Sequence, residues 1–389
     1  YEIPKRDWSS DVCSSDLISH ALFSERCLLL SPTSSGKSLI IYSTMRWHLE
    51  YKRKCIIVVP TTSLVEQLYS DFEDYSSENK WKVSKHCQRL YSGFPKEFNS
   101  DVLITTWQSI VKQPATWFKQ FDVIFGDEAH TFKAKSLTTI MEKLTTCKYR
   151  IGTTGTLDNK KVHKLVLEGV FGPTHRVITT KELMDSGRVA KLKIKGLLLK
   201  YDDITRQITH KASYQDEMDF LVKHESRNRF IRNLTLSTEG NTLVLFQYVE
   251  KHGKVLYDMI KEKVREDRKI FFIYGGTDTE AREAARKLME NEDNAICIAS
   301  FGVFSTGINI PSIENVIFAS PSKSKIRNLQ SIGRGLRLRE GKTHCNLFDI
   351  ADDLQRKSWK NHTLGHFAER LKIYSEEQFD YKIIEVPIQ

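Results

Sequence analysis

No apolar run in this sequence is long enough to cross a membrane as a helix. The longest ones, such as Cys55–Val59, fall far short of the ~20 residues that a spanning helix needs. No secretory signal precedes them. We therefore expect no membrane partner and a cytoplasmic location.

Paired cysteines are also lacking. The seven cysteines are scattered along the chain and none forms a Cys-x-x-Cys pair, the spacing that zinc ribbons and redox motifs use. An odd number of isolated cysteines gives no sign of a disulfide framework. It indicates reduced, buried thiols.

Acidic residues are fewer than basic ones, which gives a net charge of +10 and a pI near 9.1. Clustered Lys and Arg gain affinity for polyanions by displacing counterions, so nucleic acid is a candidate partner. A solvated basic face would give the same balance. Because a single core rarely grows past ~250–300 residues, the length of 389 residues predicts two domains.

Short apolar runs alternate with helical patterns in both halves of the chain, which predicts an α/β fold with two parallel-sheet units. The predicted strands are residues 27–30, 55–59, 83–90, 102–105, 123–125 and 149–152 in the first half, and 242–246, 269–274, 295–299, 315–318 and 345–348 in the second. The clearest predicted helices are 37–52, 63–75, 249–264 and 279–290. Thr277 and Glu280 predict a capping box for the last of these helices.

We expect a first domain over residues 1–180 and a second over 238–389, with a polar tail after residue 349 whose role the sequence does not indicate. Residues 181–237 lack continuous alternation and predict a connecting segment with an extended stretch, 192–201, and a helix, 216–232. Residues 5–17 have neither the helical nor the strand period of apolar residues. They are similar to translated sequencing adapter, so we expect that they are not native.

The strongest local signal is SPTSSGKS at residues 31–38, which follows an apolar strand and opens a helix. In that context backbone N–H groups cradle phosphate, Lys37 neutralises phosphate oxygens and the Ser38 hydroxyl binds Mg²⁺. Ser31 stands where the full P-loop pattern has its first glycine. The competing interpretation is a solvated serine-rich loop with an ordinary lysine.

A second signal is the acidic pair Asp127 and Glu128, which follows the apolar strand 123–125. Ligands of open α/β sheets gather at the carboxyl ends of the strands. Asp127 would there bind Mg²⁺, and Glu128 would act as general base on the attacking water. A solvated acidic turn is the alternative for either residue alone, but both signals come in the order that a P-loop ATPase requires.

With these residues in place, the chain resembles the DEAH-type helicases of superfamily 2 over about residues 18–389. Short strings follow the order of the family's motifs: 31–38 (I), 59–62 (Ia), 105–108 (the next nucleic-acid motif), 127–130 (II), 154–156 (III), 245–247 (IV), 305–309 (V) and 330–337 (VI). The resemblance implies two tandem RecA-like parallel-sheet domains with a nucleotide cleft between them.

The resemblance also implies ATP and Mg²⁺ as cofactors and assigns a role to each matching position. The catalytic residues would be Lys37, Asp127, Glu128, Gln330, Arg334 and Arg337, with Ser38 and Asp127 holding the metal ion. The nucleotide would bind to Thr33, Ser34, Ser35, Gly36, Lys37, Ser38, Gly307 and Asn309. Nucleic acid would contact Pro60, Thr61, Thr106, Gln108, Phe246, Gly276, Thr277 and Thr306. Coupling would run through His130, Thr154 and Thr156.

Physical chemistry supports two of these assignments. Arginine supplied across an interface stabilises phosphoryl transfer by a factor of ~10³–10⁵, and Arg334 and Arg337 would share one face of a helix. Gly276 permits close approach of a phosphate to bare N–H groups. An ordinary tight turn before a capped helix is the alternative at Gly276 and Thr277.

The function that the resemblance implies is an ATP-dependent helicase that remodels branched DNA or R-loops in recombination, repair or replication. Its partner would be single-stranded DNA, branched DNA or an RNA–DNA hybrid, and the motor would be monomeric, in the host cytoplasm if a phage encodes it. One alternative is a duplex-tracking translocase of the restriction type. Another is a nucleic-acid-binding module with a silent ATPase, because Trp8 runs into Ser9 where the family places an adenine-reading glutamine.

Overall fold

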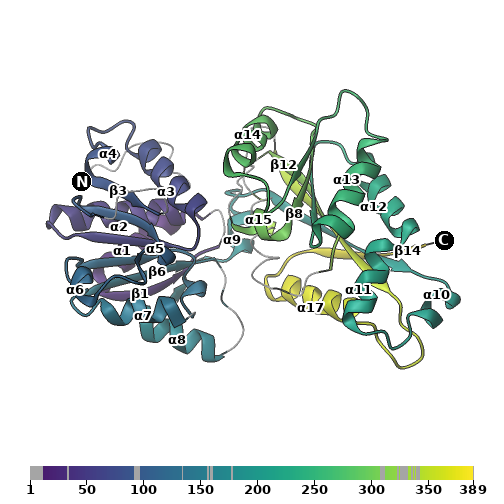
Figure 1. Ribbon diagram of the computed structural model, residues 1–389, viewed down its shortest axis with the longest axis horizontal. Helices are drawn as coiled ribbons and strands as arrows, with labels where there is room; N and C mark the ends of the chain where they lie inside the picture. The colour runs from purple at the N-terminus through teal and green to yellow at the C-terminus, as the bar shows by residue number, and fades with distance from the viewer. Residues whose placement is uncertain are drawn as a thin grey trace. The chain divides into compact units, whose positions relative to one another are not determined.

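The computed structural model describes residues 12–32, 35–91, 97–133, 135–155, 157, 161–176, 178–306, 312–321, 324, 332–333, 336, 338 and 342–388. The chain divides into two units, Tyr1–Thr179, drawn in purple to teal, and Thr180–Gln389, drawn from teal through green to yellow (Figure 1). Among the helices of these described ranges, none combines the length and apolar character that crossing a bilayer demands.

The first unit is built on a seven-stranded sheet in the order β3-β4-β2-β5-β6-β1-β7, with every described pairing parallel. Its strands are β1 (Arg26–Leu30), β2 (Cys55–Val59), β3 (Cys87–Leu90), β4 (Val102–Thr106), β5 (Val123–Gly126), β6 (Tyr149–Thr154) and β7 (Thr174–Arg176). The helices are α1 (Val12–Phe23), α2 (Lys37–Glu50), α3 (Thr62–Tyr75), α4 (Val83–His86), α5 (Trp107–Ile110), α6 (Ala115–Phe118), α7 (Lys135–Lys143) and α8 (Lys161–Phe171), with a 3₁₀ turn at Ala129–Lys133.

Helices cover both faces of this sheet, and β2 shows how its sequence allows that. Cys55, Ile57 and Val59 pack with residues of α1, α2 and α3, whereas Ile56 and Val58 pack with residues of α5 to α8. All five side chains of β2 are buried. A strand covered on both sides has a continuous apolar sequence, which is what residues 55–59 show.

The second unit is a seven-stranded parallel sheet in the order β10-β11-β9-β12-β13-β8-β14. Its strands are β8 (Lys191–Lys200), β9 (Asn241–Phe246), β10 (Ile270–Ile273), β11 (Ile296–Ser300), β12 (Ile313–Phe318), β13 (His344–Asp353) and β14 (Tyr381–Pro387). The helices are α9 (Thr180–Asp185), α10 (Asp203–Ile208), α11 (Tyr214–Lys223), α12 (Glu225–Ser237), α13 (Lys254–Lys261), α14 (Thr279–Glu290), α15 (Phe301–Thr306) and α17 (His362–Glu376).

Residues 181–237 do more than connect two domains, which corrects the sequence-based expectation. They supply β8, which lies between β13 and β14 in the second sheet, and the helices α11 and α12, which pack on the core through Leu221 and Ile231. Their charged residues concealed this role because the strand alternates exposed and buried positions.

Three local expectations also need correction. Residues 83–90 form α4 followed by β3 rather than one strand. Residues 249–264 begin with a π-helical turn, Val249–Gly253, before α13; Gly253 approaches Phe246 so closely that a Cβ there would lie 2.6 Å from the ring. The cap of α14 is Asp278, whose side chain accepts from the Ala281 N–H at 2.7 Å.

Candidate functional site

Three neighbouring strands of the first sheet bring the predicted nucleotide-binding residues together. The order β5-β6-β1 places the ends of these strands side by side, and Leu30 pairs with Thr154. The Ser31 N–H then donates to the Thr154 carbonyl at 3.0 Å. The phosphate loop, the acidic pair and the motif III position therefore share one sheet edge, as expected for a ligand site of an α/β fold.

The phosphate loop is closed by its own hydrogen bonds. Gly36 caps α2 with φ of 82°, a left-handed conformation that favours glycine. Lys37 Nζ donates to the carbonyls of Ser31 and Pro32 at 3.4 and 3.2 Å. The buried Ser31 hydroxyl forms a hydrogen bond with the Ser35 hydroxyl, so the residue in place of the usual glycine has a bonding role inside the loop.

Asp127 is a buried carboxylate that accepts a hydrogen bond from Thr153 Oγ1 at 2.7 Å. Burial raises the pKa of Asp127 from 3.8 to about 6, and the Glu128 charge adds to the rise, whereas Lys37 opposes it. Thr153 is a site residue that the sequence interpretation missed, although it immediately precedes the motif III string. An acidic pair near a lysine, with one carboxylate buried and the other half-buried, suits a divalent cation, which would neutralise the pair.

Glu128 follows β5 in a left-handed conformation, with φ of 50°. For a residue other than glycine this conformation is uncommon and is held in place by its surroundings, which is typical of functional positions. His130 Nδ1 lies 3.4 Å from Glu128 Oε2 and 3.1 Å from Thr154 Oγ1. His130 thus joins the acidic pair to the end of β6.

The metal-binding prediction for Ser38 meets a competing contact. Its hydroxyl lies 3.1 Å from the Tyr75 hydroxyl at the end of α3. When Ser38 donates this hydrogen bond, its lone pairs stay available to a cation. The described ranges hold no cluster of three or more His, Cys, Asp or Glu side chains suited to a metal; magnesium sites that share phosphates use only one or two carboxylates.

Comparison with known proteins identifies the family. The ATP-dependent DNA helicase uvsW of Enterobacteria phage T4 is 35% identical over 381 residues, covering 94% of this chain and 75% of that protein. The chain belongs to the UvsW-like helicases of superfamily 2. It is therefore an ATP-dependent enzyme, which confirms the expected activity and use of nucleotide.

Further matches agree with this assignment. The family described as type III restriction enzyme, res subunit, matches residues 17–159, and the helicase conserved C-terminal domain matches residues 225–339. The ATP-dependent DNA helicase RecG of Helicobacter pylori is 19% identical over 371 residues, covering 93% of this chain and 51% of RecG. The DNA-bound restriction-modification enzyme LlaBIII, 16% identical, shares the fold with a TM-score of 0.69 over 99% of this chain and 31% of its own. The expected pair of RecA-like units is confirmed.

In the first unit of this helicase, the predicted nucleic-acid contacts lie at the ends of two neighbouring strands or just beyond them. Val59 pairs with Thr106, so Pro60 and Thr61, which follow β2, lie beside the end of β4. Thr61 caps α3 by accepting from the Leu64 N–H. The Thr106 hydroxyl bonds to Ser109, while Gln108 is exposed.

In the second unit, the prediction that the Phe246 side chain contacts nucleic acid is wrong. Phe246 has no exposed surface and stacks on Phe272 with ring centroids 5.5 Å apart. An apolar residue at the end of a buried strand packs in the core. Gly276 is exposed, and the Thr277 hydroxyl accepts from the Tyr274 N–H at 3.1 Å, so it holds the turn.

Several predicted positions lie outside the described residues or have only a described backbone. Thr306 ends α15, and its side chain is not described. The positions outside the described ranges are Thr33, Ser34, Thr156, Gly307, Asn309, Gln330, Arg334 and Arg337. Their roles stay predictions.

Proposed function

We propose that this helicase acts on DNA and remodels branched DNA or R-loops, as a monomeric motor in recombination, repair or replication. The observation that supports this most strongly is the 35% identity with a protein named as a DNA helicase, across 94% of the chain. RecG, also named as a DNA helicase, matches most of the chain.

The nucleotide site supports a defined division of labour. Lys37 binds the β- and γ-phosphate oxygens in place of the loop carbonyls that it now contacts. Asp127 and Ser38 hold Mg²⁺, which supplies positive charge for the phosphate oxygens. Glu128 accepts a proton from the water that attacks the γ-phosphorus as the bond to ADP breaks, and His130 orients the Glu128 carboxylate.

Residues of the second unit complete the site in this proposal. Gln330 contacts the γ-phosphate or its water, and Arg334 and Arg337 stabilise the charge that develops on the transferred phosphoryl group. Gly307 and Asn309 contribute to nucleotide binding. DNA lies along Pro60, Thr61, Thr106 and Gln108 in the first unit, and along Gly276, Thr277 and Thr306 in the second.

The test measures ATP hydrolysis with single-stranded, duplex, forked and RNA–DNA hybrid substrates. Lys37→Ala and Glu128→Gln should abolish the DNA-stimulated rate. Lys148→Ala and Glu25→Gln are matched controls, because this exposed ion pair lies outside the site, and they should retain the rate. A DNA-stimulated rate that survives Lys37→Ala would show that the hydrolysis does not depend on this site and would refute the proposed roles of its residues.

A duplex-tracking translocase is the second candidate, favoured by the restriction-enzyme family that matches residues 17–159. Forked DNA separates the two functions. A helicase releases a labelled strand from the fork, whereas a translocase displaces a third strand from a triplex without separating the duplex.

A further inference from the structure

Two arginines of the second unit are fully buried, and each pairs with an aspartate of β13. Arg227 of α12 donates to Asp352 through Nε at 2.8 Å and Nη2 at 3.1 Å. Arg370 of α17 donates to Asp349 through Nε and through Nη2 at 2.7 Å. All four side chains are at most 1% exposed.

The two pairs match in a further respect, because each carboxylate also accepts from a tyrosine hydroxyl at 2.8 Å. Tyr201 donates to Asp352, and Tyr374 donates to Asp349. Burial of an ion pair costs desolvation that good geometry roughly offsets, so such a pair is weak evidence for stability alone. Because the two pairs match in burial and in their tyrosine contacts, they should contribute similarly to the free energy of folding.

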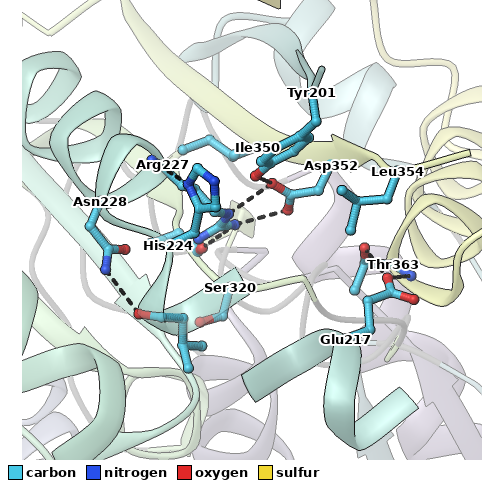
Figure 2. A network of polar contacts seen from close by, with 12 residues as sticks. Tyr201, Glu217, His224, Arg227, Asn228, Ser320, Ile350, Asp352, Leu354 and Thr363 are labelled. Atoms are coloured by element: carbon cyan, nitrogen blue, oxygen red, sulfur yellow. Dashed lines mark hydrogen bonds and ion pairs between the residues drawn. The ribbon is translucent and has the colours of Figure 1, made fainter. Parts of the chain in front are cut away.

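They differ in what else the arginine holds. Arg227 lies beside Asp352 (Figure 2). Its Nη2 also donates to the Ala319 carbonyl at 2.9 Å, just beyond the end of β12. Arg370 Nη2 instead reaches the Ile350 carbonyl of β13, at 3.4 Å. The first pair thus joins α12 to the exit of another strand, whereas the second pair stays within β13 and α17.

The residue after Ala319 is held from a second side. The buried Ser320 hydroxyl accepts from the Gln247 N–H at 3.2 Å and lies 3.0 Å from His252 Nδ1. Gln247 is the last residue of the motif IV string, 245–247, and directly follows β9. The contacts of Arg227 and Ser320 therefore fix the ends of β9 and β12 relative to each other.

The arginine of the first pair also keeps an unused donor. Arg227 Nη1 is buried and has no hydrogen-bond partner among the residues that the structure describes, and the same holds for His252 Nε2. Arg370 has no such atom within those ranges. Buried polar groups are nearly always paired, so a cluster that leaves two atoms unpaired is costly for a purely structural device.

We propose that Arg227 is a positioning residue for ATP hydrolysis: with Asp352 it fixes the point from which the chain leaves β12 toward Gln330, Arg334 and Arg337. The inference rests on the proposed function of those residues. Ser320 is 10 residues before Gln330 in the sequence. A displacement of about 1 Å at a positioning contact can cost roughly 100-fold in rate.

The matched arginines supply the experiment. Arg227→Lys and Arg370→Lys each replace a planar fork by a single ammonium, which cannot reproduce a bidentate pair and a third contact. Urea denaturation should show similar losses of stability for the two variants. At a temperature where both are folded, Arg227→Lys should lower the DNA-stimulated kcat about tenfold or more with KM for ATP nearly unchanged, the pattern of a lost transition-state interaction.

The controls separate the outcomes. Arg370→Lys should keep kcat, and so should Tyr201→Phe, which removes one bond to Asp352 but leaves Arg227 on Ala319. Ser320→Ala tests the same anchor without touching the ion pair, and it should lower kcat even if Arg227→Lys does not fold. Equal kcat in Arg227→Lys and Arg370→Lys, or an unchanged kcat in Ser320→Ala, overturns this inference alone. A wild-type rate no higher than that of Lys37→Ala overturns the proposed function and this inference with it.

Discussion

Glu217 of α11 caps the start of α17, a helix far from it in the sequence. Its removal should destabilise the second unit strongly. Its buried carboxylate accepts from the N–H groups of His362 and Thr363 at 2.8 Å each, at the start of α17. It also accepts from the Thr363 hydroxyl at 2.6 Å and from Asn361 Nδ2 at 2.9 Å. Figure 2 shows the side chains of Glu217 and Thr363 together.

The expected cost follows from the backbone donors that lose the Glu217 carboxylate as acceptor. Glu217→Ala removes this acceptor from the buried Thr363 N–H and from the partly buried His362 N–H, and hydrogen bonds to a charged group contribute about 1.5–3 kcal/mol each. We expect a loss of about 4 kcal/mol in the free energy of unfolding. Glu217→Gln keeps one oxygen but turns an amide N–H₂ toward a donor, which should cost about 2 kcal/mol.

The assay is urea denaturation followed at Trp359, the sole tryptophan among residues 180–389. Labelling with 5-fluorotryptophan and ¹⁹F NMR isolates its signal, and its ring packs edge-on to His210 with centroids 5.5 Å apart. The matched control is Asp278→Ala, which removes the exposed cap of α14 and should cost about 1 kcal/mol. A Glu217→Ala variant no less stable than Asp278→Ala would refute the reasoning.

Three further predictions concern buried groups. Because the pKa of Asp127 is raised to about 6, its charge opposes folding as pH rises above 3.8; Asp127→Asn should stabilise the Mg²⁺-free protein by about 2–3 kcal/mol at pH 8 and not at pH 4 in urea titrations. Burial, with Arg227 nearby, lowers the pKa of His252 to about 3. Below pH 6.5 this imidazole is therefore protonated in the unfolded chain but stays neutral in the folded chain. Wild type should lose about 2 kcal/mol between pH 7.5 and 5 through this group, and His252→Gln should lose correspondingly less. Phe246→Ala should cost about 3–5 kcal/mol by calorimetry or urea, because it empties a core position; a loss under 1 kcal/mol would mean that the ring is not buried.

The elements that the sequence predicts best are a strand covered on both faces and a helix with a regular period. Residues 55–59 coincide with β2, and residues 279–290 coincide with α14. Both have a pattern that one kind of element satisfies, a continuous apolar run or a helical period. Several other strand boundaries shift by one or two residues, as at Asn241 in β9. The largest shift is in β13, which runs to Asp353, past the predicted end at residue 348.

The elements that the sequence does not reveal are stabilised by buried charge. Residues after 349 look polar, yet Arg370 and Tyr374 of α17 are buried against Asp349. Arg227 likewise made α12 look like part of a solvated connection. A charged residue in a sequence predicts an exposed position unless its ion-pair partner is known. The partner of Arg227 is Asp352, 125 residues away in the chain.

The candidate nucleotide site was predictable in its residues but not in its internal contacts. The order of short strings located Lys37, Asp127 and Glu128. The roles of Thr153 and Ser31 depend on which strands are neighbours, and a single sequence does not specify that order. Phe246 shows the opposite error, because a motif position was assigned a contact although its side chain faces the core.

The place of β8 in the second sheet decides where this protein can be divided. Ten residues of β8 pair with β13, from Lys191 with His344 to Lys200 with Asp353, and β14 pairs only with β8 within the described ranges. A fragment that begins at residue 238 would lack β8. The edge of β13 that pairs with β8 would then be exposed along its full length, and β14 would lose its neighbouring strand. Autonomous folding of the C-terminal half therefore requires a start near Thr180, so the stretch that looks like a linker belongs to the piece that follows it.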